Sequence, residues 1–285
     1  MSTALRFLVV DGYAKSGRDD LQAGGASTAG DLYARMLGEY APGCTIDIVY
    51  PADSAASLTD GAGLDQYDGV AWTGSSLTIY ADDPQVTRQI DFARAAFEAG
   101  VPSFGSCWAA QIAVVAAGGG VAAHPQGREM FLARKISLTP EGRGHPLYQG
   151  KKSVFDGYIS HDDEITHLPP GATVLACGDY THVQAVSVIR SGGVFWGLQY
   201  HPEYDLHEMA MLISCRKKKL QNLGFFADED AAQAHVDQLE SLFQNPARKD
   251  IAWKLGIDGD ILNKDVRQAE VKNWIEQLVI PSKAS

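Results

Sequence analysis

Residues 101–121 read VPSFGSCWAAQIAVVAAGGGV, and this stretch decides how the rest of the chain is interpreted. The apolar run 101–104 predicts a short buried strand. Residues 109–117 are almost entirely Ala, Val and Ile and are followed by three glycines, which predicts a buried helix ended by glycine. Only Gly105-Ser106-Cys107-Trp108 is left for the turn between strand and helix.

A cysteine on so tight a turn occupies the position where α/β enzymes carry a nucleophile. The turn lifts the Cys107 side chain clear of the sheet, and the N-terminus of the following helix favours the thiolate. The competing interpretation is an ordinary buried free cysteine, since cysteine is among the most buried residue types.

A second segment, VFWGLQYHPEY at 194–204, favours the catalytic interpretation. An apolar strand is predicted to end just before His201, and Pro202 disfavours helix for the residue before it. A cysteine nucleophile needs a base, and the base needs a group that orients it. His201 and Glu203 are therefore the candidate base and orienting carboxylate.

GSCWAAQ at 105–111, followed by GLQYHPE at 197–203, resembles the class I (triad-type) glutamine amidotransferases, whose elbow pattern is G-x-C-x-G-x-Q. Residues 67–70 with 73–76 resemble that family's oxyanion strand and loop, and YISHDD at 158–163 resembles its guanosine monophosphate synthetase-like branch. The resemblance spans roughly residues 5–213 and includes four motifs in order. One position departs from the pattern, because Ala109 stands where the family has glycine.

The resemblance implies a flavodoxin-like α/β fold, with a mostly parallel sheet and helices on both faces. It implies a catalytic triad of Cys107, His201 and Glu203. The oxyanion hole would comprise Gly74, Ser75 and Trp108. By the same resemblance, the substrate's α-carboxylate would be bound by Gln111, Ser160 and His161. Asp163 would contact the α-amino group, although a plain turn residue is an equal alternative for it.

The order of the remaining patterns agrees with an α/β fold. Strands are expected at 5–10, 44–50 and 68–73, with helices opened by Thr28 and by Asp83-Pro84. The polar segment 14–27 is expected to be a flexible loop. This alternation predicts a parallel sheet covered on both faces. Further short strands are expected at 133–139, 153–160, 173–177, 184–189 and 193–199.

From residue 205 onward the pattern is helical, with helices expected at 206–223, 228–243, 247–255 and 264–279. We therefore divide the chain into a catalytic domain at 1–213 and a helical extension at 214–285 that packs on it. The basic cluster 216–219 is expected to be mainly a solvated helix face, with anion recruitment as a lesser alternative. The extension contains no phosphate-binding glycine motif.

The formal net charge of −11 argues against nucleic acid as a partner. No apolar run approaches the roughly 20 residues that span a bilayer. The four cysteines lack CxxC spacing, so neither a disulfide framework nor a metal site is expected, and a reducing cytoplasm suits a working thiolate. No cofactor is expected.

Three functions compete. The chain is either a glutaminase that releases ammonia, with a separate synthetase as its partner, or a hydrolase of γ-glutamyl amines or peptides that acts alone. A non-catalytic regulatory protein on the same scaffold is disfavoured by the intact Cys107, His201 and Glu203. Ala109 and Trp108 beside the nucleophile do not decide between the first two. A homodimer is left open.

Overall fold

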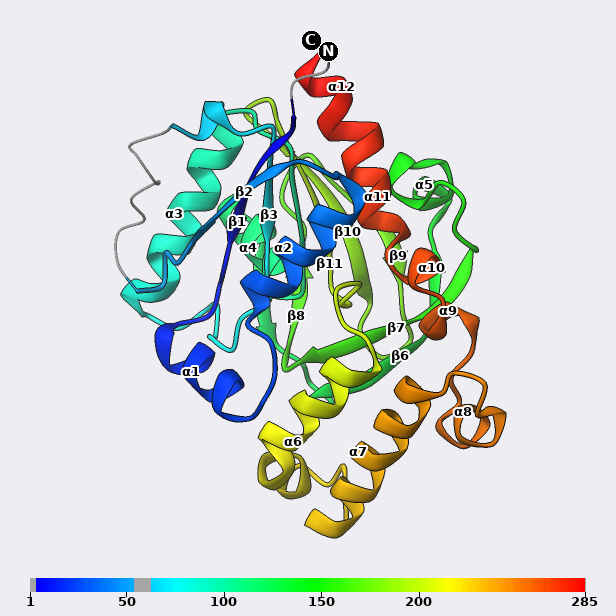
Figure 1. Cartoon of the computed structure of the whole chain (residues 1–285). Helices are drawn as coiled ribbons and strands as arrows, with labels where there is room; N and C mark the ends of the chain where they lie inside the picture. The colour runs from blue at the N-terminus through cyan, green and yellow to red at the C-terminus, as the bar shows by residue number, and fades with distance from the viewer. Residues whose placement is uncertain (1–3, 54–62, 285) are drawn as a thin grey trace.

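The computed structural model describes residues 4–53 and 63–284 and contains a nine-stranded central sheet (Figure 1). Its strands are β1 (Arg6–Val10), β2 (Thr45–Val49), β3 (Gly69–Trp72), β4 (Ser103–Ser106), β6 (Glu129–Leu138), β7 (Val154–His161), β9 (Ala172–Cys177), β10 (Val183–Arg190) and β11 (Gly193–Leu198). Their spatial order is β2-β1-β3-β4-β11-β10-β9-β6-β7.

The sheet has a parallel half and an antiparallel half. Strands β2, β1, β3, β4 and β11 pair in parallel, and the pairs from β11 through β10, β9 and β6 to β7 are antiparallel. Because β3, β4 and β11 are parallel neighbours, their carboxyl ends lie at one edge of the sheet. The loops after these three strands carry Cys107, His201, Glu203 and the segment 74–75, so the topology brings these candidate residues together, whereas Ser160 and His161 come from β7.

Helices cover both faces of the sheet, as the α/β prediction requires. Side chains alternate along β1, so Leu8 and Val10 belong to one buried cluster, whereas Phe7 and Val9 belong to the other. The first cluster is closed by α3 (Pro84–Glu98) and α4 (Trp108–Ala116). The second is closed by α2 (Ala29–Tyr40) and by α11 (Ala269–Trp274).

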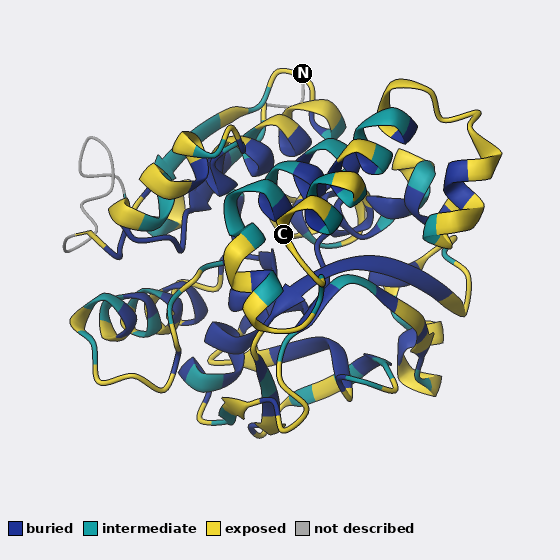
Figure 2. Cartoon of the chain, turned by 90° about the horizontal axis from the view of Figure 1, so that it is seen from below, coloured by how far each residue is buried: buried dark blue, intermediate teal, exposed yellow. Residues whose placement is uncertain are grey.

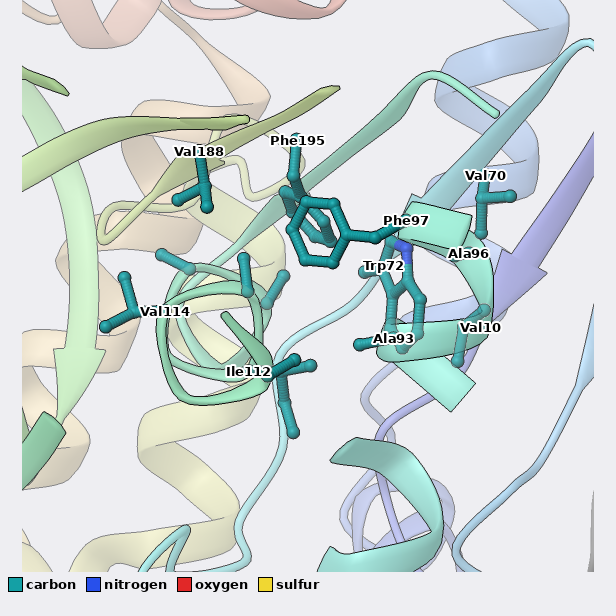
Figure 3. Packing of buried hydrophobic residues seen from close by; sticks show 14 of the residues in the cluster. Val10, Val70, Trp72, Ala93, Ala96, Phe97, Ile112, Val114, Val188 and Phe195 are labelled. Atoms are coloured by element: carbon teal, nitrogen blue, oxygen red, sulfur yellow. The ribbon is translucent and has the colours of Figure 1, made fainter. Parts of the chain in front are cut away.

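The first cluster is packed with large side chains, several of them aromatic (Figure 3). The Phe195 ring of β11 lies 5.8 Å from the Trp72 ring of β3 and 6.1 Å from the Phe97 ring of α3, measured between centroids. Ile112 and Val114 of α4 complete this layer. The central strands β1, β3, β4 and β11 are buried along most of their length, whereas the edge strand β2 is mostly half-buried. The outer helices alternate between buried and exposed residues (Figure 2).

The predicted helix starts are confirmed by their caps. The Thr28 hydroxyl accepts a hydrogen bond from the Asp31 N–H at the start of α2, and the Asp83 carboxylate accepts one from the Gln85 N–H at the start of α3. Each cap satisfies a backbone donor that has no partner inside its helix.

The expectation of a flexible loop at 14–27 is wrong, because this segment contains α1 (Lys15–Ala23). The helix is polar on its outer side, and Leu21 alone is buried in it. Leu21 packs in a cluster with Leu212 and Ile213 from the chain's later part. A nine-residue helix is marginal by itself, so this tertiary contact decides its structure.

A two-stranded sheet of β5 (Gly120–Ala123) and β8 (Asp163–His167) was not predicted. Its antiparallel pairing joins residues about forty positions apart, such as Ala123 and Asp163. The β8 sequence DEITH is polar and reads as a turn, so only the long-range partner identifies the strand.

The C-terminal part is helical, as expected, with different boundaries. Its helices are α6 (Leu206–Asn222), α7 (Glu229–Gln244), α8 (Lys249–Leu255), α9 (Gly259–Leu262), α10 (Lys264–Arg267), α11 and α12 (Ile280–Lys283), with a π-helical turn η4 (Ile275–Val279) before α12. The single helix expected at 264–279 is wrong, because it breaks at Gln268. The remaining short elements are η2 (Leu64–Gln66), α5 (Pro140–Gly144) and η3 (Pro146–Tyr148).

Trp274 of α11 is fully buried beneath the sheet. Its ring centroid lies 5.6 Å from those of Phe7 and Phe104, which belong to β1 and β4. The last helices therefore complete the core of the sheet, although the division of the chain at residue 213 stays a prediction. None of the helices in the described ranges has the length and apolar character needed to span a membrane.

Candidate active site

Cys107 stands between β4 and α4, on the turn that the sequence predicted. Its backbone has φ 55° and ψ −105°, a conformation that residues other than glycine rarely adopt. The turn is held to β11, because the Cys107 N–H donates to the Leu198 carbonyl at 2.7 Å. The thiol is 5% exposed and donates to the Ser160 carbonyl at 3.7 Å.

The turn is possible because Gly105 has no side chain. A Cβ at Gly105 would lie 2.3 Å from the Trp72 carbonyl oxygen and 2.5 Å from the Ala109 Cβ. Strand β4 therefore packs directly against β3 and the first turn of α4. The departure at Ala109 leaves the elbow closed, since its methyl group fits against this glycine.

His201 and Glu203 follow β11 and form a buried pair. The His201 Nδ1–H donates to Glu203 Oε1 at 2.6 Å, and the His201 backbone N–H donates to the Tyr158 carbonyl at 2.8 Å. Within the described parts of the chain, the buried His201 Nε2 has no hydrogen-bond partner. The ring is thus fixed through one nitrogen and leaves the other for proton exchange.

The surroundings of His201 favour its charged form. Burial by itself lowers the pKa of His201, but the Glu203 carboxylate and the Cys107 side chain outweigh burial and raise this pKa to about 10. The ring also stacks on Tyr204, with centroids 4.3 Å apart and an interplanar angle of 10°. An imidazolium held in this way can donate a proton at neutral pH.

Ser106 is a functional neighbour that the sequence analysis missed. Its hydroxyl donates to Glu203 Oε1 at 2.8 Å and accepts from the Tyr33 hydroxyl at 2.8 Å. This chain of hydrogen bonds orients the carboxylate that orients His201. The only sign in the sequence that Ser106 belongs to the site was its position next to Cys107. Nothing in the sequence pointed to Tyr33 of α2.

The loop after β3 approaches the same point. A Cβ at Gly74 would lie 3.2 Å from His201 Cε1 and 3.8 Å from the Cys107 Cβ, so the loop backbone passes close to both. The loop is fixed by the Ser75 hydroxyl, which donates to the Gly12 carbonyl at 2.8 Å. Opposite it, the Trp108 indole donates to Gln89 at 2.8 Å.

A cavity of about 130 Å³ opens at the thiol. Its wall includes most of the residues predicted for the site, namely Ser75, Cys107, Trp108, Gln111, Ser160, His161, Asp163 and His201. Glu203 lies behind His201 and faces a separate cavity of about 180 Å³. A larger cavity of about 520 Å³ lies between β6 and the helices α7 and α8, but it lacks both Cys107 and His201.

The candidate substrate-binding residues differ in how freely they face this cavity. The Gln111 amide donates to the Asp163 carbonyl at 3.3 Å. Asp163 Oδ1 accepts from the Tyr80 hydroxyl at 2.9 Å, and burial raises the pKa of this carboxyl group. Ser160 contacts the thiol through its carbonyl and Arg128 through its hydroxyl, at 2.7 Å.

His161 has both ring nitrogens engaged. Nδ1 lies 2.8 Å from the Asp163 carbonyl and Nε2 lies 3.1 Å from Glu129 Oε2, which also accepts from the Thr181 hydroxyl at 2.6 Å. This leaves no ring nitrogen to act on Cys107. His201 is therefore the better placed of the two histidines.

The expectation of a mainly solvated face for the cluster 216–219 holds for Lys218 and Lys219, which are exposed, and is wrong for Arg216, which is half-buried in a cavity wall. Arg216 and Lys219 of α6 line the cavity together with Arg128. The Asp162 carboxylate accepts a hydrogen bond from Arg128 and lies 3.6 Å from the Lys219 ammonium group. Burial by itself raises the pKa of Asp162, but these two cations outweigh burial and hold the pKa below its usual range. Which residues of a basic cluster face a cavity depends on how their helix packs against the rest of the protein. The sequence of the cluster alone does not contain this information.

No group of three or more His, Cys, Asp or Glu side chains in the described ranges is arranged to hold a metal ion. The four cysteines are all free thiols, and Cys107 alone among them is buried. The cavity presents a thiol and an imidazole, and a carboxylate contacts the far side of the imidazole.

Residues 32–216 match the family model of the class I glutamine amidotransferases. The chain belongs to this family. It is 34% identical over 282 residues to a γ-glutamyl-L-1-hydroxyisopropylamide hydrolase from a Pseudomonas species. This alignment covers 98% of this chain and 94% of that protein. It is also 28% identical over 177 residues to a glutamine-hydrolyzing GMP synthase from Leifsonia xyli subsp. xyli, of which it covers 33%.

The fold agrees with this assignment. A glutamine amidotransferase from Thermotoga maritima superposes with a TM-score of 0.68 at 15% identity, covering 97% of this chain and 99% of that one. The likeness therefore includes the C-terminal helices, whereas the GMP synthase match covers 61% of this chain. The predicted class I amidotransferase fold is confirmed.

Proposed function

We propose that this amidotransferase-family chain hydrolyses the γ-amide bond of γ-glutamyl amines and releases glutamate and the free amine. The observation that carries the proposal is the cavity in which Cys107 meets His201, itself paired with Glu203 at 2.6 Å. The end-to-end similarity to a γ-glutamyl amide hydrolase supports this leaving group. No synthetase domain is needed for the reaction.

The nucleophile in this proposal is Cys107. Its proton passes to His201 Nε2, the ring nitrogen left free by the Glu203 contact. The thiolate then attacks the γ-carbonyl carbon, and the carbonyl oxygen becomes an oxyanion. Backbone N–H groups of Gly74, Ser75 and Trp108 receive this charge, and loss of one such donor typically costs about 3 kcal/mol.

The leaving amine departs with a proton from His201. Collapse of the tetrahedral intermediate breaks the carbon–nitrogen bond and leaves a γ-glutamyl thioester on Cys107. Water, deprotonated by the now neutral His201, attacks the thioester carbonyl and releases glutamate. The thiolate–imidazolium pair is thereby restored, and Glu203 stabilises the imidazolium in both halves of the cycle.

The second candidate is release of ammonia from glutamine for a separate synthetase. The similarity to glutamine-hydrolyzing GMP synthases favours it, and the chemistry at Cys107 would be the same. The two candidates differ in the leaving group. An alkylamine needs room that ammonia does not, and an ammonia-delivering subunit would gain activity from its partner.

Turnover of the purified full-length protein on L-glutamine and on γ-glutamyl isopropylamide, with glutamate release as the readout, separates the candidates. We expect the alkylamide to have the higher kcat/KM. A strong preference for glutamine would instead favour the glutaminase, and absence of turnover on both compounds would contradict the proposed function.

The role of Cys107 is tested in the same assay. We expect Cys107→Ala to abolish hydrolysis and to leave the far-UV circular dichroism spectrum unchanged, because alanine is accepted at a helix start. Cys215→Ala is the matched control and should retain full activity. A glutamine analogue with a reactive carbonyl should label Cys107 in mass spectrometry, and labelling of Cys44, Cys177 or Cys215 instead would sink the assignment.

A further inference from the structure

Helix α6 brings two cations, Arg216 and Lys219, into the wall of the cavity that holds Cys107, and Arg216 is the more buried of the two. The side chain is half-buried, and its Nη1 lies 3.4 Å from the Ser160 hydroxyl. Tyr13 and Tyr204 line the same cavity. The Arg216 guanidinium takes part in no step of the proposed reaction.

Arg216 differs from its cationic neighbours in having no acidic partner. Arg128 and Lys219 both pair with Asp162. In residues 4–53 and 63–284, by contrast, no carboxylate lies within ion-pair distance of Arg216. A guanidinium is always charged, and removing it from water without an anion is costly. An anionic group of the bound ligand would supply the missing partner.

The cavity also presents a carboxylate in addition to this cation. Asp163 lies on the same wall and contacts the Tyr80 hydroxyl at 2.9 Å, without a cationic partner of its own among the ion pairs of the described residues. A γ-glutamyl group carries an α-carboxylate and an α-amino group on one carbon atom. The charges of Arg216 and Asp163 are complementary to these two groups.

Ser160 links this cation to the nucleophile. Its carbonyl accepts from the Cys107 thiol at 3.7 Å, and its hydroxyl lies 2.7 Å from Arg128 and 3.4 Å from Arg216. The guanidinium and the thiol therefore contact opposite ends of one residue. One γ-glutamyl group carries both a carbonyl for the thiol and a carboxylate for Arg216.

We propose that Arg216 binds the α-carboxylate of the substrate and thereby restricts the site to γ-glutamyl compounds whose α-carboxylate is free. The inference rests on the proposed function for its choice of substrate. Charge-assisted hydrogen bonds from a planar guanidinium suit a carboxylate in strength and geometry. A compound whose α-carboxyl group is blocked as an amide or removed lacks the anion that Arg216 requires.

The test compares two substrates that differ in this group alone, γ-glutamyl isopropylamide and 4-aminobutanoyl isopropylamide. In Arg216→Gln we expect KM for the first to rise about 10- to 100-fold, as for loss of one charge-assisted hydrogen bond, with kcat changed less. Hydrolysis of the second should be nearly unaffected, so that the discrimination collapses. Lys218→Gln removes an exposed charge from the same helix and should change neither substrate.

Equal losses on both substrates would show that Arg216 only supports the wall, and would overturn the inference. If Arg216→Gln does not fold, Arg216→Lys serves in the same comparison, with a smaller loss confined to the carboxylate substrate. Calorimetric binding of L-glutamate and 4-aminobutyrate gives a readout that needs no turnover. Failure of the wild type to hydrolyse either amide contradicts the proposed function, whereas equal binding of both ligands by the wild type contradicts the role of Arg216.

Discussion

At the scale of single residues, the site depends on one buried carboxylate, that of Glu203, and on the two side chains that donate to it. Glu203 accepts from both His201 and Ser106, so the carboxylate is fixed on two sides. It outweighs the effect of burial, which alone would lower the pKa of His201, and together with Cys107 raises that pKa to about 10. The imidazolium is consequently the resting form at neutral pH.

This arrangement predicts the pH dependence of the reaction. Because protonation of the leaving amine needs the imidazolium, kcat should fall as the pH rises through the His201 pKa of about 10. In Glu203→Gln the raising charge is lost, so the alkaline limb should move to lower pH. The pH profile of kcat for wild type and variant measures this shift.

Substitution of the two residues should also differ in severity. His201→Ala should lower kcat by roughly 10²- to 10⁴-fold, the usual contribution of a general acid–base group. Glu203→Gln should retain more activity, because an amide can still accept from the ring. A Glu203 variant with the wild-type rate and the wild-type alkaline limb would contradict the assigned role of this carboxylate.

The raised pKa of His201 also makes the free energy of unfolding depend on pH. The pKa of His201 is raised from an ordinary 6.5, so the folded state holds this proton more tightly than the unfolded chain does. The resulting contribution to the free energy of unfolding is fully present below pH 6.5 and is lost as the pH rises toward 10.

At the scale of elements, the elbow between β4 and α4 works because two backbones approach each other without an intervening side chain. Gly105 provides this approach, and Cys107 takes up the unusual backbone conformation that follows. The Leu198 carbonyl of β11 fixes the turn from the other side. Three neighbouring strands thus determine the position of one thiol.

Gly105→Ala should therefore destabilise the protein by about 1–3 kcal/mol, because the added methyl group meets backbone that cannot move easily. Gly38→Ala is the matched control: Gly38 lies on α2 with no atom within 4 Å of an added Cβ. That change should be neutral or stabilising by up to ~1 kcal/mol. Urea unfolding midpoints measure both, and equal stability of the two variants would contradict the close approach at Gly105.

At the scale of the whole molecule, the C-terminal helices belong to the same packed unit as the sheet. Trp274 lies against Phe7 and Phe104, and a Cβ at Gly69 would come within 2.9 Å of its ring. In addition, Lys151 near the end of η3 forms a fully buried ion pair with Glu270 of α11. These contacts disfavour a detachable partner-binding module.

Two tryptophans of this region provide a test. Trp274→Ala should lower the free energy of unfolding by about 3–5 kcal/mol, since the side chain is fully buried among aromatic rings. Trp253→Ala removes a side chain that is 84% exposed and should change stability by less than ~0.5 kcal/mol. A Trp274 variant as stable as the Trp253 variant would show that the last helices do not complete the core.

By itself, the sequence determined the local features that short-range physics controls. The elbow around Cys107, the caps at Thr28 and Asp83, and the strands before His201 were predicted, since each depends on a few adjacent residues. The approach of His201 to Cys107 was expected from the resemblance to the family, and the structure places the two residues after the neighbouring strands β11 and β4.

Other features depend on partners that are distant in the chain, and these could be identified only in the folded structure. These include the helix at 15–23, the strand β8, the support of Glu203 by Ser106 and Tyr33, and the entry of Arg216 into the cavity. Polar segments such as 14–27 and 216–219 have no apolar periodicity strong enough to fix their environment. The burial of such segments is set by what docks against them, and this information is absent from any local window of the sequence.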